Sequence, residues 1–313
     1  MEQVTLGRTG LLVSPVGLGC GGYSRLGMRQ GKDEKQAERL VGQALDLGIN
    51  FFDTARVYGT EEVVGRAVAH VRDQVVISTK TIIRDGDGNF LPAARLVESL
   101  EKSLTRLQTD CVDVFSFHGV NAGELDHCLE VLVPVMQQQI DAGKIRHLGI
   151  TESFQGEPMH EMLERAVPAG CFDVVMVGFN FLNASARRNV FPQCLEHGVA
   201  TQVMHAVRHV LTDEALLAET IAGLVDAGEI DPAMLEAADP VTAIRQHPEV
   251  ASLTEAAYRF CRHELGATVV LTGTGNIEHL KANVAALQRP PLPADLQDRL
   301  QRAFGSVRTA SGD

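Results

Sequence analysis

The stretch INFFDTARVYGTEEVVG, residues 49–65, begins as an apolar strand, passes through a short polar loop and enters a helical pattern. Nearly continuous apolar runs of this kind are typical of parallel strands that are covered on both faces. The same order of strand, loop and helix recurs along the chain. It predicts strands over eight segments: 13–20, 50–55, 75–80, 112–119, 145–151, 173–180, 200–206 and 267–273.

Eight strand–helix units within 313 residues predict an α/β protein in which a (β/α)8 TIM barrel forms a single domain, residues 1–313. An open doubly wound sheet is the main alternative. That fold requires a G-x-G-x-x-G turn between the first strand and a helix. The sequence GLGCGG at 17–22 matches this turn only loosely, and the following YSRLGMRQGKDE does not begin a helix. The barrel is therefore favoured.

Three segments fall outside the eight units. Residues 3–12 predict a β-hairpin with its turn near Arg8–Gly10, placed at the bottom of the barrel. Residues 207–250 predict a long insertion after strand seven, and a connection of this length is more often a functional lid than slack chain. The polar tail, residues 306–313, is expected to be frayed.

Composition restricts the class of partner. The formal net charge of −12 argues against nucleic acid or an anionic membrane as a partner, since both favour a basic surface. No apolar run approaches the roughly 18 residues that span a bilayer, and the polar N-terminus carries no visible secretory signal. The six cysteines form no C-x-x-C pair and are expected to be reduced thiols in a cytoplasmic protein. Nothing in the sequence indicates an oligomeric state.

Ionisable residues stand at the ends of three consecutive strands, where barrel enzymes carry their active sites. Asp53 ends strand two and Tyr58 follows it, Lys80 ends strand three, and His118 ends strand four. Each residue alone is more often structural: a cap, loop packing, a solvated lysine or a satisfied histidine. Their convergence on one rim instead indicates a functional cluster.

These four side chains suit proton transfer to a carbonyl oxygen. A tyrosine has a pKa near 10, and a nearby ammonium such as that of Lys80 lowers it by stabilising the phenolate. Asp53 is expected to pair with Lys80, and a neutral His118 to orient the carbonyl. Two histidines four residues apart (His205, His209) and the pair Cys261 and His263 lack further ligands, so no metal site is expected.

The sequence resembles the aldo-keto reductase family over almost its whole length. The segments that carry the resemblance are QVTLGRTGLLVSPVGLGCGG, FFDTARVYGTEEVVGRAV, ISTK, VDVFSFHG and KIRHLGIT, in the family's order. The resemblance implies a nicotinamide cofactor, NADP(H) or NAD(H), bound across the barrel top without a Rossmann domain. It also implies a catalytic tetrad of Tyr58, the general acid/base, with Asp53, Lys80 and His118.

The implied nicotinamide contacts depart from the family pattern. Thr151–Glu152 stands in place of a Ser-Asn pair, Met176 in place of a glutamine, and Met204 in place of a stacking aromatic residue. An ionised Glu152 can accept hydrogen bonds but not donate them, so it is expected to accept from the carboxamide NH2 group. Methionine packs on an aromatic face less rigidly. The side-chain contacts with the nicotinamide are thus expected to differ from those of the family.

The segment TGTGNIEHLKAN, residues 272–283, has a glycine-rich turn that leads into a helix start, which is an anion site built from free backbone N–H groups. It is similar to the family's adenosine-phosphate loop. In many members a lysine or arginine in this loop binds the 2′-phosphate of NADPH. The corresponding positions here are Gly275 and Asn276, which are uncharged. The hypothesis is relaxed or NAD-leaning specificity, unless Lys281 or Arg208 reaches the phosphate. The remaining implied contacts are Gly21, Gly273, Thr274, His279 and Asn283.

The function expected from these features is NAD(P)H-dependent reduction of an aldehyde or ketone to an alcohol, with a small molecule as the substrate. One alternative is a sugar or alcohol dehydrogenase that runs in the oxidative direction. Another is a cofactor-binding regulatory barrel with little turnover. The substrate pocket is expected to include Tyr23, Arg56 and parts of 84–91 and 207–250. Arg208 could either contact cofactor phosphates or hold the insertion in place.

Overall fold

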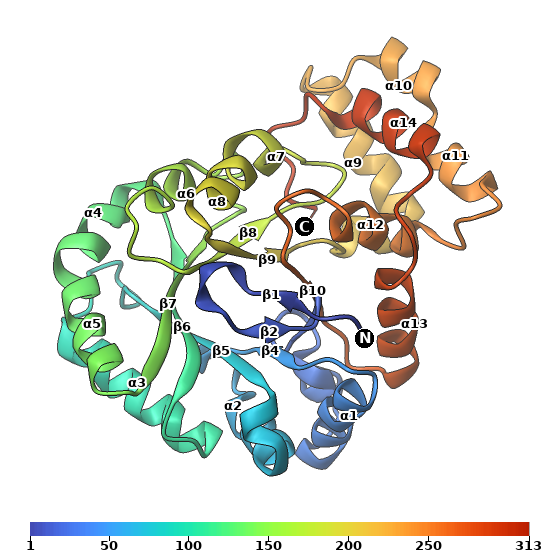
Figure 1. Cartoon of the computed structure of the whole chain (residues 1–313). Helices are drawn as coiled ribbons and strands as arrows, with labels where there is room; N and C mark the ends of the chain where they lie inside the picture. The colour runs from blue at the N-terminus through green and yellow to red at the C-terminus, as the bar shows by residue number, and fades with distance from the viewer. Residues whose placement is uncertain (313) are drawn as a thin grey trace.

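The computed structural model describes residues 1–312 and contains a closed barrel of eight parallel strands in the order β10-β3-β4-β5-β6-β7-β8-β9. All eight strands expected from the sequence are present, so the predicted fold is confirmed (Figure 1). Their bounds are β3 Val16–Gly19, β4 Phe51–Asp53, β5 Val76–Ile82, β6 Val112–Val120, β7 Ile145–Glu152, β8 Val174–Gly178, β9 Ala200–Met204 and β10 Val269–Thr272.

Helices surround the barrel and bury its outer face. They are α1 Glu34–Asp46, α2 Glu61–Val68, α3 Ala93–Leu107, α4 Leu125–His127, α5 Val133–Asp141, α6 Glu161–Ala166, α7 Ala186–Asn189, α8 Phe191–His197, α12 Leu253–Arg262 and α13 Ile277–Leu287. A π-helical turn, Cys128–Leu132, lies between α4 and α5. Pro134 follows at the start of α5, and it lacks the N–H that a regular helix would donate to the carbonyl of Glu130.

The N-terminal hairpin closes the bottom of the barrel, as expected. Strand β1 (Val4–Thr5) pairs antiparallel with β2 (Leu12–Val13). Leu6 and Val13 pack with the first inward residues of the barrel strands, in a small apolar cluster that includes Phe51, Val76, Val114, Val174, Ala200 and Val269. The hairpin lies in front of the barrel in Figure 1, so the opposite end of the barrel remains open for a site.

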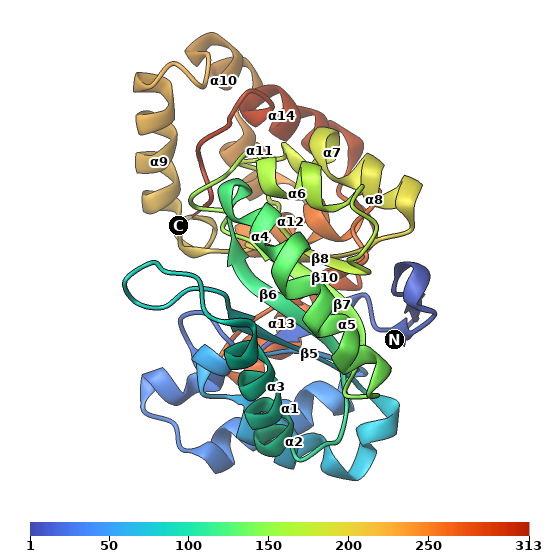
Figure 2. The same ribbon diagram turned by 90° about the vertical axis from the view of Figure 1, so that its left-hand side faces the viewer.

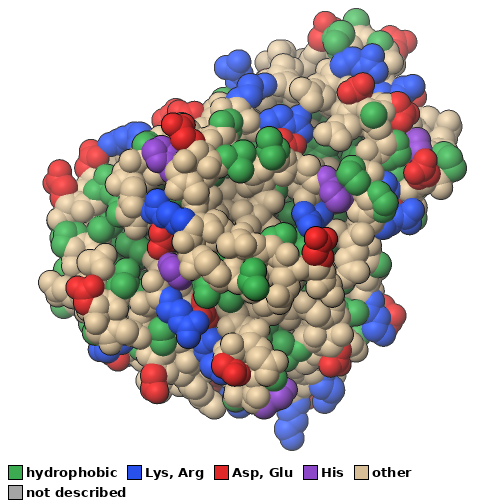
Figure 3. Space-filling model, viewed as in Figure 1, with side chains coloured by type: hydrophobic (Ala, Val, Ile, Leu, Met, Phe, Trp, Pro, Cys, Tyr) green, Lys and Arg blue, Asp and Glu red, His purple; other side chains and the backbone are tan. Residues whose placement is uncertain are grey.

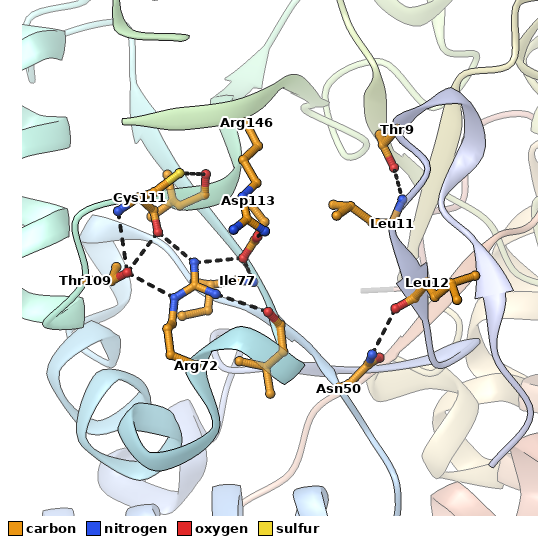
Figure 4. A network of polar contacts seen from close by, with 12 residues as sticks. Thr9, Leu11, Leu12, Asn50, Arg72, Ile77, Thr109, Cys111, Asp113 and Arg146 are labelled. Atoms are coloured by element: carbon orange, nitrogen blue, oxygen red, sulfur yellow. Dashed lines mark hydrogen bonds and ion pairs between the residues drawn. The ribbon is translucent and has the colours of Figure 1, made fainter. Parts of the chain in front are cut away.

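A buried carboxylate stabilises the lower part of the barrel. Asp113 accepts hydrogen bonds from the Ile77 amide (2.8 Å) and the guanidinium group of Arg146 (2.6 Å), and it forms an ion pair with Arg72 at 2.9 Å. Arg72 also donates to the carbonyl of Val75 (3.1 Å) (Figure 4). Two cations and a backbone amide offset the free-energy cost of desolvating this carboxylate. Their contacts link β5, β6 and β7.

The insertion after strand seven is helical and packs against the end of the chain. It contains a 3-10 turn, η7 (His209–Thr212), and the helices α9 (Glu214–Asp226), α10 (Pro232–Ala238) and α11 (Pro240–Gln246). A further helix, α14 (Ala294–Phe304), was not expected from the sequence and packs on α10 and α11. In Figure 1 the helices α9, α10 and α11 lie together to the side of the barrel, and in Figure 2 α9 lies on the side of the molecule opposite the N-terminus.

The tail expected to be frayed is instead anchored, so that expectation was wrong for residues 306–312. Glu229 of the insertion accepts hydrogen bonds from the amides of Arg308 (2.7 Å) and Thr309 (3.1 Å). The carbonyl of Ser311 accepts from the side-chain amide of Asn180 at 3.1 Å. Residues far away in the sequence supply these partners, so local composition does not reveal them. Asp313 lies outside the described residues.

On the hairpin side, lysine and arginine side chains are interspersed with aspartate and glutamate (Figure 3). Among residues 1–312, no helix is both long enough and apolar enough to cross a bilayer.

Candidate active site

The barrel brings the four predicted catalytic side chains together at its open end. Asp53 is the last residue of β4, Lys80 lies in β5 and His118 lies in β6. These strands are neighbours, with Asp53 opposite Ser78 and Ile82 opposite His118. Tyr58 ends η3 (Arg56–Tyr58), the short turn that leaves β4. Parallel pairing therefore places residues that are distant in sequence on one rim.

Lys80 is fully buried between its partners. Its ammonium lies 2.7 Å from Asp53 Oδ2, 2.8 Å from the Thr54 carbonyl and 4.8 Å from the centre of the Tyr58 ring. Burial lowers the pKa of Lys80, but the charges of Asp53 and Tyr58 outweigh this effect and raise the pKa above its usual range. The ammonium therefore stays charged next to the phenol.

His118 is neutral and faces the same phenol. Its Nε2 lies 3.4 Å from the Tyr58 hydroxyl. Burial and the charge of Lys80 lower the pKa of His118 to about 3. Within residues 1–312, Nδ1 of this ring is buried without a hydrogen-bond partner. A proton on Nδ1 would thus be an unpaired buried donor, whereas a proton on Nε2 points to the site, so the Nε2–H tautomer is favoured.

A cavity of about 450 Å³ opens beside Tyr58. It is lined by predicted residues from five loops or strand ends: Gly21, Tyr23, Met176, Met204, Arg208, Gly273, Thr274 and Gly275. Gly21 is required there because a Cβ atom at this position would lie 2.4 Å from the ring of Tyr58. The cavity thus connects the catalytic phenol with the glycine-rich turn after β10.

Other predicted residues lie elsewhere. Arg56 lines a separate cavity of about 310 Å³ beside the loop between β5 and α3. His279 is exposed on α13, while Asn283 donates to the Thr272 hydroxyl at 2.9 Å. Asn276 caps α13 by accepting from the Glu278 amide at 2.9 Å. None of these four residues is among those that line the cavity beside Tyr58.

Thr151 and Glu152 make contacts inside the protein rather than at the cavity wall. The Thr151 hydroxyl accepts from the Gly119 amide at 2.7 Å. The buried Glu152 carboxylate lies 2.9 Å from Nδ1 of His160 and accepts from the Gly178 amide at 2.7 Å. Burial raises the pKa of Glu152, and His160 opposes this rise. The Glu152 carboxylate thus has two partners inside the protein, and sequence reasoning missed one of them, His160.

We predict that Glu152→Ala lowers the free energy of unfolding by about 3–5 kcal/mol, because it leaves buried His160 and the Gly178 amide without their acceptor. Urea denaturation measures this change. Glu161→Ala, at an exposed position on α6, is the matched control and should stay within about 0.5 kcal/mol of the parent. Unchanged stability together with weakened cofactor binding would instead place Glu152 on the ligand.

Sequence reasoning also missed part of the cavity wall. Ser24 and Gln30, in the loop after β3, line the cavity and were not expected, whereas His209, which also lines it, falls within the expected range 207–250. The rings of Tyr23 and His209 meet edge to face with their centres 4.0 Å apart. The loop after β3 has no hydrophobic periodicity, so its glycines were the only sequence feature that could have indicated a place at the cavity wall. Among residues 1–312, no group of three or more His, Cys, Asp or Glu side chains could hold a metal.

Comparison with known proteins agrees with this geometry. The model of the "Aldo/keto reductase family" matches residues 15–303. The aldo-keto reductase YhdN of Bacillus subtilis is 31% identical over 300 residues, covering 90% of this chain and 87% of that protein. The L-galactose dehydrogenase of Arabidopsis thaliana is 29% identical and covers 92% of this chain and 88% of that protein.

Solved structures show the same similarity. The holo form of aldo-keto reductase AKR11C1 from Bacillus halodurans superimposes with a TM-score of 0.73 at 25% identity, covering 99% of this chain and 97% of that one. The family model spans nearly the whole barrel, including the strands that carry Asp53, Lys80 and His118. The chain therefore belongs to the aldo/keto reductase family of oxidoreductases.

Proposed function

We propose that this chain reduces an aldehyde or ketone to an alcohol with NADPH or NADH. The observation that carries the proposal is the position of Lys80, held by Asp53 at 2.7 Å and placed 4.8 Å from the Tyr58 ring. A charged ammonium so close to a phenol serves proton transfer at the phenol oxygen. A purely structural ion pair has no need of a tyrosine at the edge of a cavity.

Each residue then has a defined part in the reaction. When bound in this cavity, a reduced nicotinamide would supply the hydride that the carbonyl carbon receives. Tyr58 donates its hydroxyl proton to the carbonyl oxygen, and Lys80 stabilises the phenolate that remains. Neutral His118 donates its Nε2–H to the same oxygen and orients the substrate. Asp53 keeps Lys80 charged and in place.

The residues present fit a nicotinamide dinucleotide. The cavity beside Tyr58 also includes Gly273, Thr274 and Gly275, the turn that precedes the N-terminus of α13. Free amides at a helix start suit a phosphate, and barrels often bind phosphate after strands seven and eight. Met176 and Met204 offer apolar contacts for the nicotinamide ring. The holo form of the similar AKR11C1 supports a bound cofactor.

A second candidate is the oxidation of a sugar or another alcohol with NAD(P)+. The similarity to an L-galactose dehydrogenase favours it, at 29% identity over most of both chains. The same residues act in reverse: the phenolate of Tyr58, stabilised by Lys80, accepts the hydroxyl proton of the alcohol.

The test is to follow absorbance of the reduced nicotinamide in both directions. Purified protein is mixed with NADPH or NADH and a panel of aldehydes and ketones, and separately with NADP+ or NAD+ and a panel of sugars and simple alcohols. Turnover in the first set supports the reductase, and turnover in the second alone supports the dehydrogenase. A protein that binds either cofactor but turns over neither panel would contradict both and favour the regulatory barrel.

A further inference from the structure

The loop after β3 bends sharply towards the glycine-rich turn. It contains a 3-10 segment, η2 (Arg25–Gln30), in which Leu26 has φ of 60° and Gly27 has φ of 91°. The chain then turns again at Gly31, with φ of 83°. Left-handed conformations at these positions are favourable for glycine and uncommon for leucine. They bring the backbone of this loop against a segment almost 250 residues later.

The contact is made at Gly275. A Cβ atom at this position would lie 2.5 Å from Cα of Gly27 and 2.7 Å from the side-chain oxygen of Gln30. Any side chain would therefore displace the loop after β3. A lysine or arginine at position 275 would clash with the loop after β3, because this loop occupies the space that its side chain would need.

The same loop brings a cation to the turn. The ammonium of Lys32 donates a hydrogen bond to the carbonyl of Gly275. Its methylene chain lies over Gly27, where a Cβ atom would come 2.6 Å from Lys32 Cδ. Lys32 is half-buried, so part of it remains accessible to a ligand. An ammonium has three N–H donors, and this contact uses one of them.

The two cations expected at this turn from the sequence lie differently. Lys281 pairs with Glu278 on the same helix at 2.9 Å. Arg208 has its guanidinium 5.9 Å from the ring of Tyr23, and both residues line the cavity. Lys32, by contrast, contacts the carbonyl of Gly275 in the turn itself and is not among the residues that line the cavity. Its ammonium is therefore held at the turn rather than beside Tyr58.

We propose that Lys32 binds the 2′-phosphate of NADPH and gives this chain a preference for NADPH over NADH. The inference rests on the proposed function, because it needs a dinucleotide whose nicotinamide lies at Tyr58. The adenosine ribose is then the part that extends beyond Gly275. NADPH differs from NADH only by a phosphate on this ribose, and a charged N–H···O contact to it is roughly twice as strong as a neutral one. The preference replaces the NAD-leaning hypothesis.

The test compares Kd values for NADPH and NADH, measured through the fluorescence of the reduced nicotinamide, in the parent and in Lys32→Met. Methionine keeps an unbranched chain over Gly27 and removes the charge. The parent should bind NADPH at least tenfold more tightly than NADH. The variant should lose about 10- to 100-fold in NADPH affinity and stay within about twofold for NADH.

A fragment titration locates the effect without any catalysis. Adenosine 2′,5′-bisphosphate should raise the melting temperature of the parent more than AMP does, and this difference should disappear in Lys32→Met. Lys35→Met, at an exposed position on the first turn of α1, is the control and should behave as the parent. Equal Kd values for NADPH and NADH in the parent would overturn the proposal. Equal weakening of both cofactors in Lys32→Met would also overturn it, since Lys32 would then only support the loop. Failure of both cofactors to bind the parent would instead contradict the proposed function.

Discussion

Tyr58→Phe should lower kcat for carbonyl reduction by about 10²- to 10⁴-fold, while the Kd of the reduced cofactor stays within about threefold. The reason is local. Phenylalanine keeps the ring that packs on Gly21, where a Cβ atom would be only 2.4 Å from the ring, so the cavity should keep its shape. Only the hydroxyl is lost, and with it the proton donor that Lys80 and His118 face. Steady-state kinetics and fluorescence titration measure the two quantities separately.

Tyr258→Phe is the matched control for this experiment. Tyr258 is buried in α12 and shares a hydrogen bond of 2.9 Å with Thr272 at the end of β10, so Tyr258→Phe removes one buried hydroxyl whose partner is not Asp53, Lys80 or His118. Its kcat should remain within about threefold of the parent, since it makes no contact with the tetrad. If Tyr58→Phe kept the turnover of the parent, Tyr58 would not be the proton donor.

Lys80→Met should abolish most activity and also lower the free energy of unfolding by about 3–5 kcal/mol. It leaves the carboxylate of Asp53 buried without its cation, and Oδ1 of Asp53 already has no hydrogen-bond partner within residues 1–312. Burial raises the pKa of Asp53. A group with a raised folded-state pKa favours the folded state at low pH, so the variant should regain stability as the pH falls from 7 towards 5. Urea denaturation at several pH values measures this.

A second variant separates charge from packing. In Lys80→Met combined with Asp53→Asn, the buried charge is absent, so much of the lost stability should return and the pH dependence should weaken. Activity should stay low, because no ammonium faces Tyr58. Equal stability losses in the single and double variants would show that packing of the Lys80 chain, rather than the charge of Asp53, determines the destabilisation.

The sequence alone predicted the barrel and its catalytic rim. Strands buried on both faces appear as continuous apolar runs, and a barrel places their carboxyl ends on one side. The residues Asp53, Lys80 and His118 could therefore be expected to meet before any coordinates were known. The hairpin and the insertion were also visible, because each interrupts the repeated strand–helix order.

Contacts between segments that are distant in the sequence could not be predicted from apolar runs or from the order of strands. The tail 306–312 looks unstructured locally, yet Glu229 and Asn180 anchor it. The sequence suggests that Glu152 contacts the cofactor, but it does not reveal that the carboxylate contacts His160 and the Gly178 amide inside the protein. Helix α14 lies against the insertion, whose own helices supply the apolar surface that it covers.

Sequence thus determined the fold of this protein and the strand ends at which Asp53, Lys80 and His118 meet, since both depend on periodic patterns and on the order of strands. Only the tertiary structure decided the surroundings of the glycine-rich turn after β10. In the sequence, Gly275 is uncharged where many family members have a cation. In the fold, Gly27 packs against Gly275, and the Lys32 ammonium donates to its carbonyl. No local pattern encodes such a contact, because it depends on how two loops at the barrel rim bend towards each other.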